Sequence, residues 1–557
     1  MTTRRTRLIT GLTVGVLALG LGACSSGGEG EGDEGTTADA TALDGKRVGA
    51  MEEFGVGDTF VATEPIELSL MYRDHPNYPI KEDWLFFTAL EEKNKVSFET
   101  VLAPLSDWEQ RRSLLIGAGD APSIIPVTYP GQEAPFVASG AILPVSDYVD
   151  LMPNFQAKVE EWELEPYLDQ LRQEDGKYYL LPGLLEAPRP DYTIGIRTDV
   201  FEAAGAETEP ETWEDLAESF ADVKAANPSQ YPFSDRWSNP TSLGALLNVA
   251  APSFGTIGGW GYSSGVQWDA DAEEFVYAGA TDEYRDMVEY FHGLVEDGLM
   301  DPESLTQEDA AAEQKLISGQ SSAISTNRQE MLRHRKTLEE QGVTGARFEK
   351  IRVPSGPAGD LTAGTRLESG IMLSSSVAEE ETFVATLQLI DWLYYSDEGL
   401  EFAKWGVEGE TFEKADDGTR TLASDITYLG LNPGAPKQLN VDYGFNNGVF
   451  LLAQGSTTDL VYSMLDEEEL AWQEEMATKE PVAVAPPYPL DEIEREQVSL
   501  YQTALTDFVE ANTLQFILGD RPLSEWDAYV TELEGMNLTP FMDAVNGAHQ
   551  RYAEENG

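Results

Sequence analysis

Strand-like and helix-like segments alternate in the first part of the chain, and this alternation limits the folds that the chain can adopt. Residues 66–71 and 96–101 alternate apolar and polar side chains, and residues 123–128 form a short apolar strand. Helical patterns occupy residues 82–92 and 107–116 between these strands. Such repeats build a parallel sheet covered by helices, and ligands bind beyond the carboxyl ends of its strands. The sequence therefore predicts an α/β fold with a binding site at that edge.

The N-terminus has the pattern of an export signal. Arginines precede an uncharged apolar run, residues 8–23, which is shorter than the ~20 residues of a membrane-spanning helix. The small residues before Cys24 resemble a bacterial lipobox, in which the cysteine is lipidated, and no second cysteine exists to form a disulfide with it. We interpret residues 1–23 as a signal peptide and Cys24 as the acylated (palmitate-bearing) residue. The alternative is a secretory signal with an incidental cysteine, and the arginine pair does not decide between Sec and twin-arginine export.

The segment 24–59 is predicted to be a lipidated, flexible tether. It opens with glycine, serine and acidic residues, which bury too little apolar surface to offset the entropy lost on ordering. The protein is therefore expected at the cell membrane, facing the extracellular side, with the lipid anchor as its only membrane contact.

The charge of the chain excludes several classes of partner. The sequence has 36 basic and 99 acidic residues, a formal net charge of −63. This field repels nucleic acid and anionic headgroups, so no nucleic-acid partner is expected. Anionic solutes are also repelled, although salt screens that effect beyond about 10 Å. We interpret the charge as a solvated acidic surface that keeps an exported protein soluble.

The sequence contains no recognisable catalytic or metal-binding motif. The four histidines lack zinc-ligand spacing, and neither a GxSxG elbow nor a phosphate-binding glycine loop occurs. Carboxylate pairs for glycoside hydrolysis are uninformative among 99 acidic residues. We therefore expect no catalytic residues, no metal and no other cofactor.

Segments spread over the whole mature chain carry a resemblance to a known family. They occur in the family's order, with Ser123 where an acid is usual, and comprise residues 117–125, 176–182, 196–201, 298–303, 391–399, 405–409, 517–520 and 526–529. On these segments the chain resembles the family-1 extracellular solute-binding proteins of ABC importers, especially the large lipoprotein branch associated with oligosaccharides.

The resemblance implies a two-lobed, periplasmic-binding-protein-like (type II) α/β fold with a helix-rich C-terminal part. By the family's topology, the N-lobe takes residues 60–195 plus 352–376, and the C-lobe takes 196–351 plus 377–553. The solute binds in the cleft of a monomer, the lobes close, and the closed form is presented to the permease transmembrane subunits. Some relatives have a calcium-binding loop after the helix that starts near Trp213. In this chain residues 226–230 follow that helix and lack carboxylates at alternate positions, so no calcium is expected there.

Candidate ligand contacts follow from the chemistry of sugars. Aromatic rings cover the apolar sugar faces, and planar polar groups pair with the hydroxyls. Residues of these kinds occur after strands, at the expected lobe crossing and in loops where a core tryptophan is unusual: Tyr72, Arg73, Asp74, His75, Tyr129, Tyr192, Trp237, Trp260, Asn327, Arg328, Trp405 and Glu408. The alternatives are that the loop tryptophans plug a lobe surface, that Trp405 packs inward, that His75 caps a turn and that the arginines pair with acids. Five tryptophans in helical patterns are expected in the cores: Trp84, Trp108, Trp213, Trp392 and Trp526.

The expected function is capture of an extracellular oligosaccharide and its delivery to a permease. Two alternatives stay open: a surface-anchored glycan-degrading enzyme and a lipoprotein that adheres to polysaccharide.

Overall fold

The computed structural model describes residues 43–75, 79–237, 241–446 and 455–556. The predicted signal peptide, Cys24 and the first part of the tether lie outside these residues. Within the described ranges, no helix combines the length and the apolar character needed to cross a membrane.

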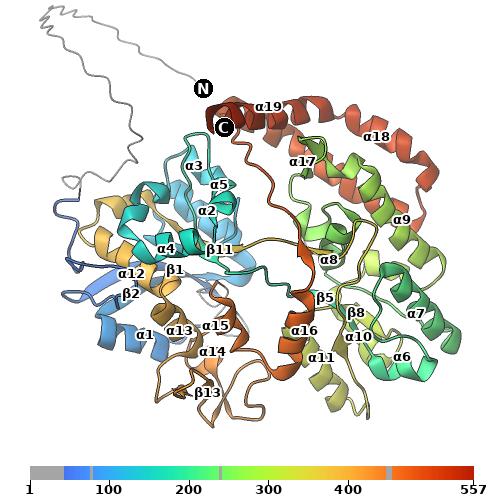
Figure 1. Ribbon diagram of the computed structural model, residues 1–557, viewed down its shortest axis with the longest axis horizontal. Coiled ribbons are helices and arrows are strands. Elements are labelled where there is room, and N and C mark those ends of the chain that lie inside the picture. The colour runs from blue at the N-terminus through green and yellow to red at the C-terminus, as the bar shows by residue number, and fades with distance from the viewer. Residues whose placement is uncertain (1–42, 76–78, 238–240, 447–454, 557) are drawn as a thin grey trace, which may run out of the picture. The chain divides into compact units, whose positions relative to one another are not determined.

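A five-stranded sheet forms the centre of the first lobe. Its order is β2 (Val96–Pro104), β1 (Ile66–Asp74), β3 (Ile124–Thr128), β11 (Leu367–Leu373) and β4 (Leu181–Leu184). Strands β1, β2 and β3 are parallel, as their spacing predicts, whereas β11 runs antiparallel to both of its neighbours. All residues of β3 are buried because helices cover both faces of the sheet (Figure 1).

Helices from two distant parts of the chain pack around this sheet. They are α1 (Leu85–Ala89), α2 (Trp108–Ala118), α3 (Ala134–Val137), α4 (Pro153–Glu161), α5 (Glu165–Asp169), α12 (Phe383–Tyr395), α13 (Asp397–Trp405), α14 (Leu439–Asp442) and α15 (Thr458–Tyr462).

The second lobe has a smaller sheet and most of the long helices. Its antiparallel sheet has the order β8 (Ala323–Thr326), β5 (Thr193–Ile196) and β9 (Glu349–Lys350), and β6 (Val266–Asp269) and β7 (Glu274–Tyr277) form a hairpin. The helices are α6 (Thr198–Ala204), α7 (Trp213–Ala226), α8 (Gly244–Phe254), α9 (Asp282–Glu296), α10 (Asp309–Ser318), α11 (Arg328–Glu340), α16 (Glu467–Met476), α17 (Glu492–Leu518), α18 (Trp526–Glu534) and α19 (Leu538–Asn556).

Short strand pairs interrupt the C-terminal part that the sequence predicts to be mostly helical. They are β10 (Leu361–Thr362) with β16 (Glu480–Pro481), β12 (Phe412–Lys414) with β13 (Arg420–Leu422), and β14 (Ile426–Thr427) with β15 (Lys437–Gln438). Helix dominates on both sides of these pairs, in α12 and α13 and again in α16 to α19 (Figure 1).

The two lobes have separate apolar cores. The residues in each core do not follow the expected lobe boundaries. Residues between 377 and 464, expected in the second lobe, bury their apolar side chains in the first core. The reason is that α12 is buried on all sides and Asp391 accepts hydrogen bonds from Asn154 of α4. The chain therefore returns to the second core only near Trp472.

Local sequence signals predict several helix boundaries correctly. Thr212 and Asp215 form a complete capping box at the start of α7, and the Thr281 hydroxyl accepts a hydrogen bond from the Tyr284 N–H at the start of α9. The five tryptophans expected in the cores are buried: Trp84, Trp108, Trp213, Trp392 and Trp526.

The loop predicted after the first strand begins later than expected. Tyr72, Arg73 and Asp74 belong to β1 because β2 continues alongside them, with Asp74 opposite Pro104. This pairing places the Tyr72 side chain inside the first core, next to Trp84.

Candidate functional site

A cavity of about 1090 Å³ lies between the two cores. The first lobe contributes residues that follow β3 and residues of α13 to α15, including Tyr129, Gln132 and Lys404. The second lobe contributes the loop around Trp260, the start of α11 and Glu510 of α17. The segment that joins β4 to β5 supplies Arg189, Asp191 and Tyr192. Both lobes and a connection between them therefore line one site.

Three aromatic rings form a cluster on the second-lobe side of the cavity. Tyr192 packs edge-on against Trp237 and Trp260, with 5.3 Å between ring centroids in each case, and the two tryptophan centroids are 5.6 Å apart. Trp260 can lie here because Gly244 has no side chain, since a Cβ at that position would collide with the indole. Tyr192 and Trp260 face the cavity, and Trp237 supports them from behind.

A buried arginine, Arg236, packs against the Trp237 ring. The backbone N–H of Trp237 donates to the Asp309 carboxylate at 2.8 Å, and the Arg236 guanidinium carbon lies 4.1 Å from the centre of the Trp237 ring. Arg236 Nη1 donates to Glu313 at 2.5 Å and to Glu330 at 2.9 Å. Trp237 has a φ of 61°, a value that a bulky residue adopts only when its surroundings enforce it.

The same network fixes the start of α11. Burial by itself would raise the pKa of Glu330, but hydrogen bonds from Arg333 and Arg236 lower it below its ordinary value, so Glu330 remains a carboxylate. The Glu330 N–H donates to the side chain of Asn327, the N-cap residue of α11, at 3.0 Å. This arrangement positions Asn327 and Arg328 at the cavity.

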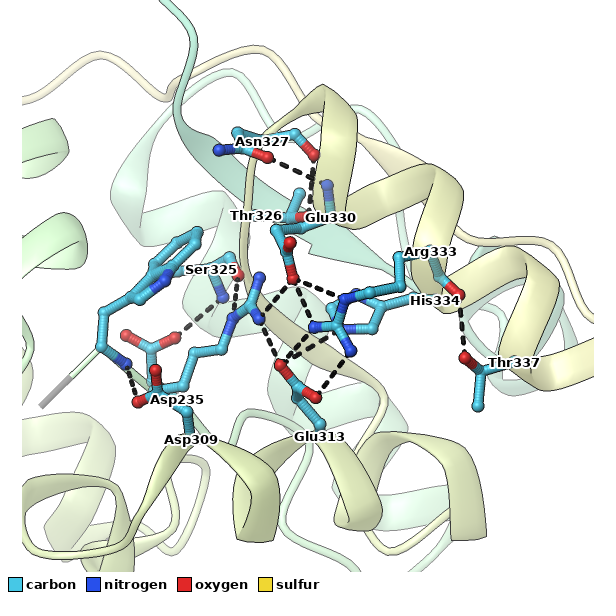
Figure 2. Close-up of polar contacts among 12 residues, drawn as sticks. Asp235, Asp309, Glu313, Ser325, Thr326, Asn327, Glu330, Arg333, His334 and Thr337 are labelled. Atoms are coloured by element: carbon cyan, nitrogen blue, oxygen red, sulfur yellow. Dashed lines mark hydrogen bonds and ion pairs between the residues drawn. The ribbon is translucent and has the colours of Figure 1, made fainter. Parts of the chain in front are cut away.

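Glu313, Glu330 and His334 are the one group in the described part of the chain whose donor atoms lie close enough together, within 4.8 Å, to hold a metal ion. Two guanidinium groups, from Arg236 and Arg333, already bind both carboxylates (Figure 2). Burial lowers the pKa of His334, which keeps its ring neutral. Arg236 and Arg333 therefore already neutralise the two carboxylates, and the cluster is better explained as a structural ion-pair network than as a metal site.

Arg328 joins the second lobe to a loop of the first. Its guanidinium donates to both oxygens of Asp466 at 3.0 and 2.8 Å, and also to the carbonyl oxygen of Leu429. Asp466 is the N-cap of α16 in the second lobe, whereas the neighbours of Leu429, Tyr428 and Leu431, pack on the first core. Arg328 therefore bridges the lobes at the rim of the cavity.

Buried charged side chains line the first-lobe wall of the cavity. Lys404 has an exposed fraction of 1%, and burial together with the Arg189 charge lowers its pKa well below the ordinary value. Burial raises the pKa of Glu368 above its ordinary value, although the nearby Arg189 charge opposes this rise. These groups can exchange hydrogen bonds or charge with a polar ligand.

The structure brings half of the predicted contact residues to this site. Tyr129, Tyr192, Trp260, Asn327 and Arg328 line the cavity, with Trp237 directly behind the aromatic pair. The others do not line it. They are Tyr72, Arg73, Asp74, His75, Trp405 and Glu408.

Three of the residues away from the cavity illustrate where the others lie. Trp405 is 1% exposed, and its Nε1 donates to the Ser463 hydroxyl, because the last turn of α13 faces the first core. Asp74 accepts the Ile80 N–H at 3.0 Å, and Glu408 is exposed.

Sequence reasoning missed the charged wall. Arg189, Asp191, Glu368 and Lys404 were not among the predicted contacts, although Asp191 directly precedes Tyr192 and Lys404 directly precedes Trp405. The proline-rich crossing before Tyr192 was a usable signal for Arg189 and Asp191, whereas Lys404 lies in an ordinary amphipathic helix.

Three comparisons bear on this geometry. Residues 76–399, more than half of the chain, match the family described as bacterial extracellular solute-binding protein. The fructooligosaccharide ABC transporter substrate-binding protein FusA of Streptococcus pneumoniae is 22% identical over 525 residues, covering 89% of this chain and 92% of FusA.

Two solved structures have a similar fold. An HMO-binding, ABC-transporter-associated solute-binding protein from Bifidobacterium longum infantis superposes with a TM-score of 0.63 at 19% identity, covering 88% of this chain and 99% of that one. An extracellular solute-binding protein from Bifidobacterium longum subsp. infantis superposes with a TM-score of 0.65 at 16% identity, covering 89% of this chain and 100% of that one.

Proposed function

Because the chain belongs to the family of bacterial extracellular solute-binding proteins, we propose that it captures an extracellular oligosaccharide between its lobes and delivers it to an ABC permease. The observation that carries this proposal is the cavity itself. It joins an aromatic face, Tyr192 and Trp260, to amides and charged groups from both lobes. Flat rings and planar polar groups are what the alternating apolar and hydroxyl surfaces of a sugar require.

The comparisons support a carbohydrate as the solute. FusA, which aligns over most of this chain, is a fructooligosaccharide-binding protein, and the similar Bifidobacterium structure is HMO-binding. The cavity volume of about 1090 Å³ slightly exceeds the usual range for ligand pockets, ~300–1000 Å³, and so favours an oligomer over a single sugar unit.

We propose that the working form is a lipid-anchored monomer that binds and releases its ligand without catalysing a reaction. Cys24, the expected lipidation site, lies outside the described residues, so the support for the anchor is the sequence pattern. Incorporation of a palmitate analogue into the wild-type chain, but not into Cys24→Ser, is the expected result of metabolic labelling. Label in both proteins would contradict the anchor.

The function is tested by titrating the mature protein with a panel of oligosaccharides in a calorimeter, with mass spectrometry of the recovered sugar. We expect reversible binding of at least one short oligosaccharide, which is recovered intact. Release of shorter products would instead establish the glycan-degrading alternative. Adhesion only to insoluble polysaccharide, with no soluble oligomer bound, would establish the other.

A further inference from the structure

One buried cation in the cavity wall lacks the partner that every comparable residue has. The buried basic side chains of the described chain are Arg112, Lys158, Arg197, Arg236, Arg328, Lys404 and Lys479. Each of them except Lys404 has a carboxylate within ion-pair distance. In a chain with 99 acidic and 36 basic residues, a carboxylate partner would be easy to supply. Within the described residues, the Lys404 ammonium has neither a hydrogen bond nor an ion pair, and a buried cation in that state is costly unless a ligand completes it.

A second cation lies beside it. Arg189 lines the same cavity, its charge acts on Lys404, and its buried Nε has no hydrogen-bond partner in the described part of the chain. Two neighbouring positive groups repel one another in a low-dielectric wall. A guanidinium and an ammonium that line one cavity suit a carboxylate, which can accept hydrogen bonds from both.

The carboxylates nearby do not satisfy these cations. Glu368 and Asp191 line the cavity and interact electrostatically with the cluster, but among the described residues neither comes within 4.0 Å ion-pair distance of Lys404 or Arg189. The other cavity arginine, Arg328, is already paired with Asp466. Among the described residues, Lys404 and Arg189 are therefore the basic groups of the cavity that have no ion pair.

We propose that Lys404 and Arg189 form an acid-binding subsite, and that the transported oligosaccharide carries a carboxylate, as uronic-acid sugars do. This inference rests on the proposed function and names the substrate class of the same cavity. The aromatic cluster covers an apolar sugar face, while the carboxylate of a ring lies between the ammonium and the guanidinium. Salt screens the field of the chain's net charge beyond about 10 Å, so the acidic surface does not prevent a carboxylate from reaching two basic groups inside the cavity.

The test compares acidic oligosaccharides with their neutral, carboxyl-reduced counterparts. Uronate oligosaccharides of several linkages, each paired with the same oligosaccharide after reduction of its carboxyl groups to alcohols, are titrated into wild type, Lys404→Met, Arg189→Gln and Lys414→Met. Lys414 pairs with Glu401 and does not line the cavity, so it is the matched control. Melting temperatures without ligand confirm that each variant is folded.

We expect an acidic member to bind wild type at least about tenfold more tightly than its neutral counterpart, and Lys404→Met and Arg189→Gln to lose this preference. Lys414→Met should keep it. Binding of neutral oligosaccharides as tightly as the acidic ones, or an acid preference unchanged in both cavity variants, would overturn the subsite and leave the proposed function standing. Absence of binding to any oligosaccharide, acidic or neutral, would overturn the proposed function, and the subsite with it.

Discussion

At the scale of single residues, the two cavity tryptophans differ in what they offer a sugar. Trp260 lines the cavity, whereas Trp237 lies behind it and touches both Trp260 and Tyr192. A ring in direct contact buries apolar surface against the ligand, and a supporting ring acts only by holding the first in place.

Replacement of these two residues should therefore have unequal effects. We expect Trp260→Ala to weaken oligosaccharide binding by ~1–3 kcal/mol, and Trp237→Ala to weaken it by a smaller amount. Calorimetric affinities are the measurement, and Trp268→Ala, on the β6–β7 hairpin away from the cavity, is the control. Unchanged affinity in Trp260→Ala would remove the aromatic cluster from the site.

Glu133 links the stability of the fold to pH. Its side chain is fully buried, and burial raises its pKa to about 7 from an ordinary 4.5. Between these values the folded protein keeps the proton and the unfolded chain loses it, so stability falls as the pH rises from 4.5 to 7. The loss at pH 7 and above is on the order of 3 kcal/mol from this group.

Replacing Glu133 with glutamine should remove this part of the pH dependence. We expect Glu133→Gln to be more stable than wild type at pH 7.5 and close to it at pH 4.5, as measured by urea unfolding at both values. Glu99→Gln, at an exposed position, should not change the slope. A wild-type slope retained in Glu133→Gln would show that the group is not titrating.

At the scale of elements, α4 depends on a residue that is distant in sequence. Its own N-cap, Met152, provides no side-chain hydrogen bond, and Asp391 of α12 accepts bonds from the Asn154 and Phe155 backbone N–H groups at 3.0 and 2.8 Å. Burial raises the pKa of Asp391 to about 6, which shows the cost of placing it there. A helix start is thus completed across the first core.

Loss of this interaction should destabilise the first lobe. Asp391→Ala leaves buried N–H donors unpaired, and we expect a cost on the order of 3 kcal/mol in urea unfolding. Asp391→Asn, which keeps an acceptor oxygen, should lose less. Asp120→Ala is the surface control, because Asp120 is exposed. A loss no larger than that of the control would contradict the capping role.

At the scale of the whole molecule, Arg328 connects the lobes. Its bonds to Asp466 remain within the second lobe, whereas its bond to Leu429 crosses to the first. Arg335 of the same helix provides a control, because it pairs with Glu468 of α16 and has no contact with that loop.

Removal of the crossing bond should favour the open form. We expect Arg328→Met to weaken ligand binding several-fold and to increase the radius of gyration measured by small-angle scattering, since closure is favoured only by contacts present in the closed state. Arg335→Met should leave both quantities near wild type. Equal changes in the two variants would attribute the effect to α16 packing and not to closure.

The sequence by itself determined what depends on near neighbours. Strand and helix periodicity, the capping box at Thr212 and the burial of tryptophans such as Trp213 and Trp526 were predictable because each follows from residues within a few turns. The family followed from the order of short segments along the chain. Tyr192, Trp260 and Asn327 were predictable as candidates because strand ends and glycine-rich loops meet at the cavity.

Only the tertiary structure decided which surfaces meet. An amphipathic face shows that a helix is buried but not against what, so the lobe to which residues 377–464 belong and the inward position of Trp405 could not be predicted. Lys404 looks like any lysine in a helix. Its role is visible only from its buried position in the cavity wall, where the charge of Arg189, more than two hundred positions earlier in the sequence, acts on it. Electrostatic interactions depend on distance through space and on burial, and neither quantity is encoded in the local order of residues.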